Sequence, residues 1–354
     1  MIDEAVLQQL IDRKIESLVI REPEPSESEK VESILLQAYA EATVKAIRNS
    51  INNACSALME FQRSVTGPNE ALLHNVWKAA EDFLWHANNS TAASMAVIAT
   101  NIIPSTDGMN ERVTQFSVNL AFLSTAMSAF QNDAPNDTLQ LGIAALLHDI
   151  SLFSYKEWFA TQPNSRDQLL RQKYRRHPLE SADLLRNLPG LSSTVLSMIS
   201  EVHEQADGSG YPRGLTLRRV KPGSEILNTA DAYLSLTNPI DGVPFVPSDV
   251  LAYLCLQASE GKFCKDTIQL LVRSLSMYPI GSCVELDNKS SAIVVKGNIQ
   301  SPLCPVVRML HSGHPELDLR NSSRFIMNPR VLTGKKAQRL SKSKLRDVLW
   351  KKDR

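Results

Sequence analysis

Apolar residues recur at helical spacing from Val31 to about Ser276, and this pattern predicts a mainly α-helical protein. The strongest stripe follows Glu111 and consists of Val113, Phe116, Leu120, Leu123, Met127 and Phe130. The segment from Leu139 to Leu147 is almost uninterrupted in its apolar character, which is typical of a buried helix. We therefore expect a helical bundle built around these two segments.

The N-terminal part of the chain is expected to form a helical region of its own. Two prolines interrupt a short amphipathic stretch, so we interpret residues 1–25 as a terminal segment and linker. A long helix is predicted from a capping box at Ser26 to Phe61, and further helices reach Ile103, which gives an N-terminal region of 26–103. The apolar stripe of the long helix can pack within the chain, which we favour, or against a second copy in a homodimer.

A small β-rich segment is predicted at residues 277–330, after a second helical domain at 104–276. Short apolar runs separated by turn residues predict strands at Cys283–Leu286, Ala292–Val295 and Val306–Leu310. The predicted fold class is therefore mainly α, with an N-terminal helical region, a helical bundle and a small C-terminal β appendix.

The last segment, residues 331–354, carries nine lysines and arginines against two aspartates. We interpret it as a solvated basic tail. The alternative is contact with nucleic acid or an anionic surface, which would make binding depend strongly on salt.

Composition narrows the class of protein without naming a partner. The chain has 354 residues, of which 43% are hydrophobic, and 38 basic side chains balance 38 acidic ones. This balance argues against a whole-molecule field that attracts nucleic acid or membranes. No run approaches the roughly 18 apolar residues of a membrane span, and no signal peptide is evident. Five scattered cysteines without a CxxC pair fit a reducing compartment, so we expect a cytoplasmic protein.

The most unusual stretch of the sequence runs from Val202 to Leu215 and reads VHEQADGSGYPRGL. His203 can offer an imidazole nitrogen to a metal, and the glycines after Asp207 form a tight turn that lets the backbone approach a ligand. Taken alone, this stretch is explained equally well by a helix that ends in a glycine-rich turn with a surface histidine.

Further histidines and aspartates extend this candidate site. The buried helix that ends at Leu147 delivers His148 and Asp149 into the interior, where unpaired polar groups are costly. His177, His203 and Asp231 also lie near predicted helix ends. Together these imidazoles and carboxylates suit Fe, Mn or Zn, provided that a bundle brings the helix ends together. His74 and His86 have no acidic or sulfur partner at ligand spacing, and we interpret them as structural or surface residues.

At these positions the sequence resembles the HD-GYP family, a branch of the HD phosphohydrolases whose active members hydrolyse cyclic di-GMP. The resemblance covers about residues 100–330 and rests on AALLHDI at 144–150, His177-Pro178, the Val202 to Leu215 stretch, and Ile226-Leu227 with Ala230-Asp231. It implies that the metal ligands are His148, Asp149, His177, His203 and Asp231.

The resemblance also implies a mechanism and a ligand. Asp149 would bridge two ions and act with His148 in catalysis. The site would hold one or two divalent metal ions, with Fe or Mn the favoured metals. A fully degenerate site would hold none. Substrate would be cyclic di-GMP or a related nucleotide, in a pocket with a wall shaped by Asp207, Gly208, Gly210, Tyr211 and Pro212. Two metals that clamp a phosphodiester can activate water and stabilise the leaving oxygen.

The sequence departs from the family pattern where the chemistry is done. Met109 and Asn110 stand near an expected histidine, and Val202 replaces another. Ser151 and Leu152 replace a Gly-Lys pair, so a cation for the scissile phosphate is missing. Further along, the second aspartate is Leu234 and an Arg-Pro-Tyr-Arg stretch is replaced by Asn-Pro-Ile-Asp at 238–241.

Two functions follow from this comparison. The departures favour a signalling or scaffold module that keeps the fold and binds a metal, a nucleotide or both, with weak or no turnover. The five retained ligands favour an active metal-dependent phosphodiesterase, because three protein ligands and a water already make a catalytic site. A changed nucleotide substrate would also explain the departures.

Overall fold

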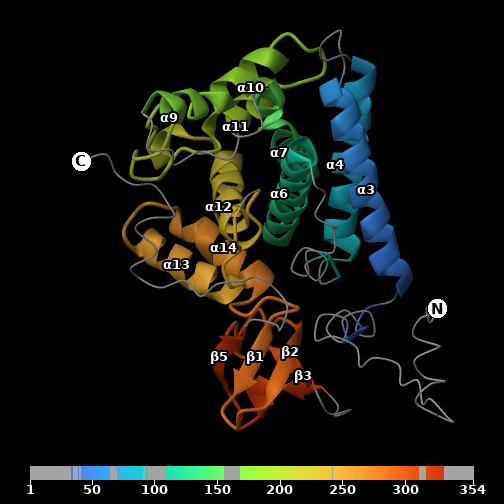
Figure 1. Ribbon diagram of the computed structural model, residues 1–354, viewed down its shortest axis with the longest axis vertical. Coiled ribbons are helices and arrows are strands. Elements are labelled where there is room, and N and C mark those ends of the chain that lie inside the picture. The colour runs from blue at the N-terminus through green and yellow to red at the C-terminus, as the bar shows by residue number, and fades with distance from the viewer. Residues whose placement is uncertain are drawn as a thin grey trace, which may run out of the picture.

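The computed structural model describes residues 33–34, 39, 41–63, 70–90, 93–94, 97, 108–154, 168–240, 242–310 and 316–330. In Figure 1 the helices lie above a small β-sheet, which is formed by the C-terminal part of the described residues. The fold class predicted from the sequence is confirmed. No helix in the described ranges is long and apolar enough to cross a membrane. The predicted linker, the basic tail and most of the last helix expected in the N-terminal region, which ends at Ile103, lie outside these ranges.

Two antiparallel helices, α6 (Met109–Gln131) and α7 (Pro135–Leu147), form the centre of the bundle. The predicted stripe of α6 is buried, with Leu120, Leu123 and Met127 fully inaccessible. The α6 helix ends at Asn132 in the left-handed conformation, and α7 begins at Pro135, so the connection is a tight turn. As predicted, most residues of α7 are buried. Its C-terminal end therefore lies in the protein interior.

Helices on two sides cover this central pair (Figure 1). On one side lie α3 (Glu41–Arg63) and α4 (Glu70–Asn89). The apolar stripe of α3 packs against α4 and α6 of the same chain, which is the intramolecular alternative. The homodimer stays a prediction. On the same side His86 is buried and lies 3.0 Å from the Ser50 hydroxyl, whereas His74 is exposed.

The other side carries the helices that complete the candidate site. These are η1 (Ile150–Ser154), α9 (Gln168–Tyr174), α10 (His177–Leu185), α11 (Ser193–Glu201), η2 (Leu217–Arg219), α12 (Pro222–Thr237), α13 (Pro247–Ser259) and α14 (Lys265–Leu275). Both α11 and α12 pack on the central pair. As a result, several connections between helices meet near the C-terminal end of α7.

The C-terminal sheet is antiparallel in the order β4-β3-β2-β1-β5. Its strands are β1 (Cys283–Leu286), β2 (Ser291–Lys296), β3 (Val306–Met309), β4 (Leu317–Asp318) and β5 (Ile326–Arg330), with η3 (Leu319–Asn321) between the last two. Successive side chains of β2 point to opposite faces of the sheet and pack in two different hydrophobic cores. Ala292 and Val294 belong to the sheet's own cluster, whereas Ile293 belongs to the core of the helical bundle. The sequence did not predict β4, which is very short, or β5, whose Pro329 is tolerated because β5 is an edge strand.

Candidate metal centre

The chain connections around α7 bring all five predicted ligands into one group. His148 is the C-cap residue of α7, and Asp149 follows it. His177 is the first residue of α10, and His203 lies two residues beyond α11. Asp231 differs from the expectation, because it lies in the middle of α12 rather than at a helix end. A helix midpoint reaches the site because α12 runs past the ends of the other helices.

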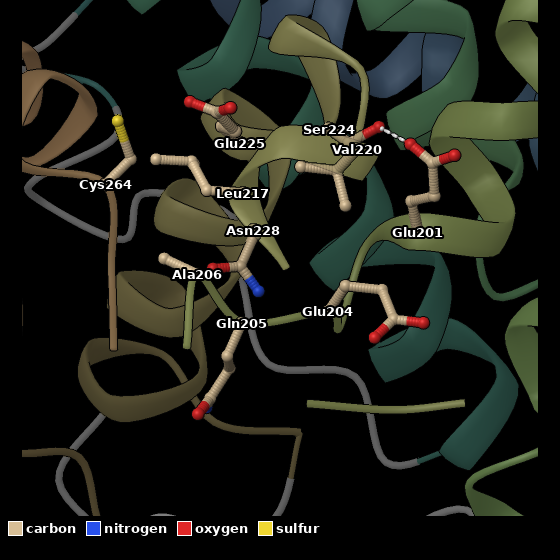
Figure 2. Close-up of a pocket in the computed structure, with 10 residues that line it drawn as sticks. All are labelled: Glu201, Glu204, Gln205, Ala206, Leu217, Val220, Ser224, Glu225, Asn228 and Cys264. Atoms are coloured by element: carbon tan, nitrogen blue, oxygen red, sulfur yellow. Dashed lines mark hydrogen bonds between the residues drawn. The ribbon is translucent and has the colours of Figure 1, made fainter. Parts of the chain in front are cut away.

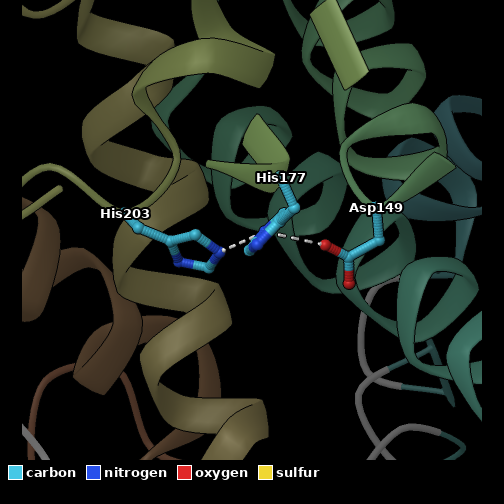
Figure 3. A group of neighbouring side chains, drawn as sticks. All are labelled: Asp149, His177 and His203. Carbon is cyan, nitrogen blue, oxygen red and sulfur yellow. Dashed lines mark hydrogen bonds and ion pairs between the residues drawn. The ribbon is translucent and has the colours of Figure 1, made fainter. Parts of the chain in front are cut away.

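The five side chains form a continuous series of polar contacts, part of which Figure 3 shows. Asp149 lies between two imidazoles, with Oδ2 at 3.1 Å from His148 Nε2 and Oδ1 at 3.2 Å from His177 Nε2. The Nε2 atoms of His177 and His203 are 3.1 Å apart, and His203 Nδ1 is 3.3 Å from Asp231 Oδ2. All five residues are buried, His148 and His177 completely.

Backbone carbonyls fix the tautomers of two imidazoles. His148 Nδ1 lies 2.7 Å from the Ala145 carbonyl oxygen, and His177 Nδ1 lies 2.8 Å from that of Tyr174. A carbonyl only accepts, so both Nδ1 atoms donate and each neutral ring directs a lone pair from Nε2 toward the Asp149 carboxylate. His148 Nε2 and Asp149 Oδ1 are buried and form no hydrogen bond of good geometry. Acceptors that face one another in this way require a cation between them.

His203 leads to the same conclusion. A neutral His203 has two possible tautomers. If Nε2 of His203 carries the proton and donates to His177, the Nδ1 lone pair of His203 faces the Asp231 carboxylate. If Nδ1 carries the proton and donates to Asp231, the Nε2 lone pairs of His203 and His177 face each other. In the second arrangement His177 and His203 would each have an Nε2 lone pair to offer to a metal, and Asp231 would accept from His203 Nδ1, as metal-bound histidines commonly require. Ligand atoms of Asp149, His177 and His203 lie within 4.8 Å of one another, so these three fit a single ion.

Protonation follows the same geometry in the metal-free chain. Burial opposes a charge on His148, but the Asp149 carboxylate outweighs it and raises the His148 pKa. Burial likewise opposes a charge on Asp149, yet its two imidazole neighbours lower its pKa. The pKa of His177 is lowered, chiefly by burial. A proton on His148 can therefore supply the missing cation, while His177 keeps its lone pair available for a metal.

The Gly-Tyr-Pro turn folds directly against His203. The Tyr211 backbone N–H donates to the His203 carbonyl at 3.0 Å, and the two rings lie 4.8 Å apart at an interplanar angle of 30°. Burial raises the pKa of the Tyr211 hydroxyl well above its usual value. A Cβ on Gly210 would lie 2.3 Å from the Gln205 nitrogen and 2.5 Å from the His203 oxygen, so this contact requires glycine.

The remaining predicted pocket residues have mainly local contacts. Asp207 is exposed, and its Oδ1 accepts from the Ser209 N–H at 2.9 Å, which closes a turn. Gly208 has a positive φ of 79°, and Pro212 follows Tyr211 in the same loop. Their role in binding substrate stays a prediction.

Comparison with known proteins now identifies the family. The profile of the HD domain family matches residues 95–263, which include all five grouped side chains. The chain is an HD-GYP phosphohydrolase-like protein. HD domains are metal-dependent, and the His/Asp cluster offers ligand atoms that could hold a metal ion.

Relatives of this HD-GYP-like protein include cyclic dinucleotide phosphodiesterases. It is 25% identical over 182 residues to the cyclic di-GMP phosphodiesterase PA4108 of Pseudomonas aeruginosa, covering 51% of this chain and 43% of the relative. It is 24% identical over 218 residues to the cyclic di-GMP phosphodiesterase PdeB of Borreliella burgdorferi, covering 62% and 57% respectively. A 3'3'-cGAMP-specific phosphodiesterase of Vibrio cholerae is 31% identical over 134 residues, or 38% of this chain and 27% of that protein.

The chain thus spans about half the length of the first two relatives. Among solved structures, the HDG"Y"P protein Bd1817 of Bdellovibrio bacteriovorus matches with a TM-score of 0.49 and 19% identity, covering 76% of this chain and 78% of that one.

The positions at which this HD-GYP-like chain departs from the family pattern are occupied by packed side chains. Val202 is fully buried, and its carbonyl accepts from the Asn228 amide at 2.9 Å. The Ser151 hydroxyl donates to the His177 carbonyl at 3.0 Å. Leu152 packs with Tyr174 and Tyr211 in a small apolar cluster, and Leu234 lies in the main core. The Met109 side chain and Asp241 are outside the described residues.

Two buried glutamates, Glu201 and Glu204, accept hydrogen bonds from the loop that follows α11 and from the start of α12. Both are drawn in Figure 2, and neither was predicted from the sequence as a site residue. Glu204 accepts from the backbone N–H groups of Arg213 at 2.8 Å and Leu215 at 2.7 Å. Glu201 accepts from the Lys221 N–H at 2.9 Å and the Ser224 hydroxyl at 2.7 Å. They line a small cavity behind the turn and tie both the loop and the start of α12 to the end of α11. The only sequence signal for Glu204 was its position beside His203.

We expect Glu204→Ala to lower the free energy of unfolding by about 2–4 kcal/mol, because two charge-assisted hydrogen bonds are lost from a buried carboxylate. Urea unfolding followed by circular dichroism measures the change. Asp183→Ala, which removes an exposed surface pair with Arg186, is the control and should cost at most about 0.5 kcal/mol. Equal effects of the two substitutions would contradict the structural role of Glu204.

Proposed function

We propose that this chain is a cyclic-dinucleotide signalling protein that binds a divalent metal and a nucleotide at the His/Asp group and has weak or no phosphodiesterase activity. The observation that carries the proposal is the buried series of contacts from His148 to Asp231, in which acceptors face acceptors. The relatives' activities supply the ligand class, because they act on cyclic di-GMP or 3'3'-cGAMP.

The chain's own residues would bind the ion and orient the nucleotide. Asp149, His177 and His203 would hold an ion, with His148 and Asp231 as further ligands or as the groups that orient them. We propose Fe or Mn, one ion or two, because carboxylate and imidazole ligands without thiolate suit these metals. A metal bound here would polarise a phosphodiester and lower the pKa of a bound water. Tyr211 would form an apolar wall beside the His203 ring.

Packing at the substituted positions supports weak activity. A lysine beside the scissile phosphate would stabilise developing charge, but Ser151 instead makes hydrogen bonds within the protein and Leu152 lies in an apolar cluster. Val202 and Leu234 offer no ligand atoms from their side chains. Each metal site would therefore have fewer protein ligands than the family pattern provides.

The alternative, an active phosphodiesterase that produces pGpG or GMP, is favoured by a different observation. The five retained side chains are preorganised by backbone hydrogen bonds at His148 and His177. Preorganised ligands need little rearrangement to hold a catalytic metal.

One experiment separates the two functions. Protein purified without oxygen is supplied with Fe(II) or Mn(II) and incubated with cyclic di-GMP or 3'3'-cGAMP, products are separated by chromatography, and binding is measured by calorimetry. We expect metal-dependent binding with little turnover. Turnover that disappears in a His148→Ala, Asp149→Ala double variant would establish the phosphodiesterase instead. Absence of both binding and turnover by the wild-type protein would reject both functions.

A further inference from the structure

Arg175 lies in the short connection between α9 and α10, two residues before His177. Its backbone N–H donates to the Arg171 carbonyl at 2.9 Å, so the connection is anchored to the last turn of α9. Its guanidinium carbon lies 5.6 Å from the centre of the Tyr211 ring. Since the Tyr211 ring packs against His203, the positive charge lies one aromatic ring away from the metal centre.

The guanidinium of Arg175 has no counter-ion within the described part of the chain. Its Nε is buried without a hydrogen-bond partner. By contrast, the next residue, Arg176, pairs with Glu180, and Arg213 pairs with Glu201. A half-buried cation without an acceptor is costly, and the face of one tyrosine ring compensates only in part. Such a group is suited to bind an anion that arrives from solution.

We propose that Arg175 binds a phosphate group of the cyclic dinucleotide at the metal centre, an inference that rests on the proposed function. A guanidinium offers several donors in a planar fork that matches phosphate oxygens. Arg175 would thereby supply a cation for nucleotide binding from another segment of the chain, without restoring a lysine at the position of Ser151 and Leu152.

The packing shows how the charge reaches this place from another segment. Leu152 fills the position after Ser151 and packs with Tyr174 and Tyr211 in one apolar cluster. Arg175 follows Tyr174 in the chain and lies over the ring of Tyr211, so it reaches the edge of the same cluster from the α9 side. The apolar cluster thus lies between the Arg175 guanidinium and the proposed metal ligands, and it is only about one aromatic ring thick at Tyr211.

The test compares Arg175→Gln with the matched control Arg176→Gln in Mn(II)-loaded protein, with cyclic di-GMP binding measured by calorimetry. We expect Arg175→Gln to weaken binding roughly 10- to 100-fold, the effect of losing a charge-assisted hydrogen bond. Arg176→Gln should stay within about twofold of wild type, because its side chain is exposed and paired on the helix surface. Arg175→Lys keeps the charge without the fork and should bind with intermediate affinity.

Manganese content and melting temperature serve as the readouts for a structural role, and both should be unchanged in all three variants. A loss of manganese or of folded protein in Arg175→Gln would show that Arg175 supports the fold, and would overturn the proposal. Equal affinity of wild type and Arg175→Gln would overturn it while leaving the proposed function intact. Failure of the wild-type protein to bind either cyclic di-GMP or 3'3'-cGAMP in the same measurement would reject both.

Discussion

Asp149→Asn is expected to lose the bound metal while it keeps the fold. The Asp149 carboxylate lies 3.1 and 3.2 Å from the Nε2 atoms of His148 and His177 and is the negative group between them. An asparagine has the same shape, but its neutral oxygen is a weaker ligand and its amide can donate to an imidazole lone pair. Since loss of a group that merely orients a ligand lowers metal affinity 10- to 100-fold, loss of this direct ligand should lower it by at least about 100-fold.

Metal content after Mn(II) loading and dialysis, measured by mass spectrometry, tests this expectation. Added Mn(II) should also raise the melting temperature of the wild-type protein, because a ligand at 100 times its Kd stabilises the folded state by about 2.7 kcal/mol, and it should not raise that of the variant. Asp183→Asn, in a surface pair with Arg186, makes the same chemical change and should behave as wild type. Retention of manganese by Asp149→Asn would place the metal elsewhere.

The sequence was sufficient to predict the helical core and the histidines and aspartates that the structure brings into one group. The stripe of α6 and the apolar run of α7 have a strong helical period, and such patterns depend on burial alone. His148 and Asp149 stood out because they follow that buried run. The conclusion that distant segments meet there came from the family resemblance, since spacing within the chain does not fix how helices pack.

The contacts inside the centre were not predictable from the sequence. Asp231 was expected near a helix end, yet it reaches His203 from the middle of α12 because of the way that helix crosses the site. Glu201 and Glu204 look like ordinary solvent-facing acids, and only the fold of the loop shows that they are buried and accept backbone hydrogen bonds. Arg175 likewise gained significance only from the position of the Tyr211 ring.

Gly210→Ala is expected to destabilise the protein and the metal centre together. Its Cβ would lie 2.3 Å from the Gln205 nitrogen, 2.5 Å from the His203 oxygen and 2.6 Å from the Glu204 carbonyl carbon. These are backbone atoms of the segment just beyond α11, so the clash can be relieved only by moving the loop or the segment that carries His203. Overpacking of a core by one methyl group costs about 1–3 kcal/mol, and we expect a loss of about 3 kcal/mol or more in the free energy of unfolding here.

The loop movement should also reach His203, a proposed metal ligand. The Tyr211 N–H donates to the His203 carbonyl and the Tyr211 ring packs against its imidazole, so a displaced loop releases both constraints on His203. We expect manganese affinity to fall at least about tenfold, in the range seen when groups that orient a metal ligand are lost. Gly261→Asn is the control for a glycine substitution without a steric clash, because a Cβ there meets no atom within 4 Å; at its φ of 84° asparagine reduces the backbone strain but does not remove it. If urea unfolding and manganese titration gave the same values for Gly210→Ala as for this control, the turn would not position His203, and the metal would depend on the helices alone.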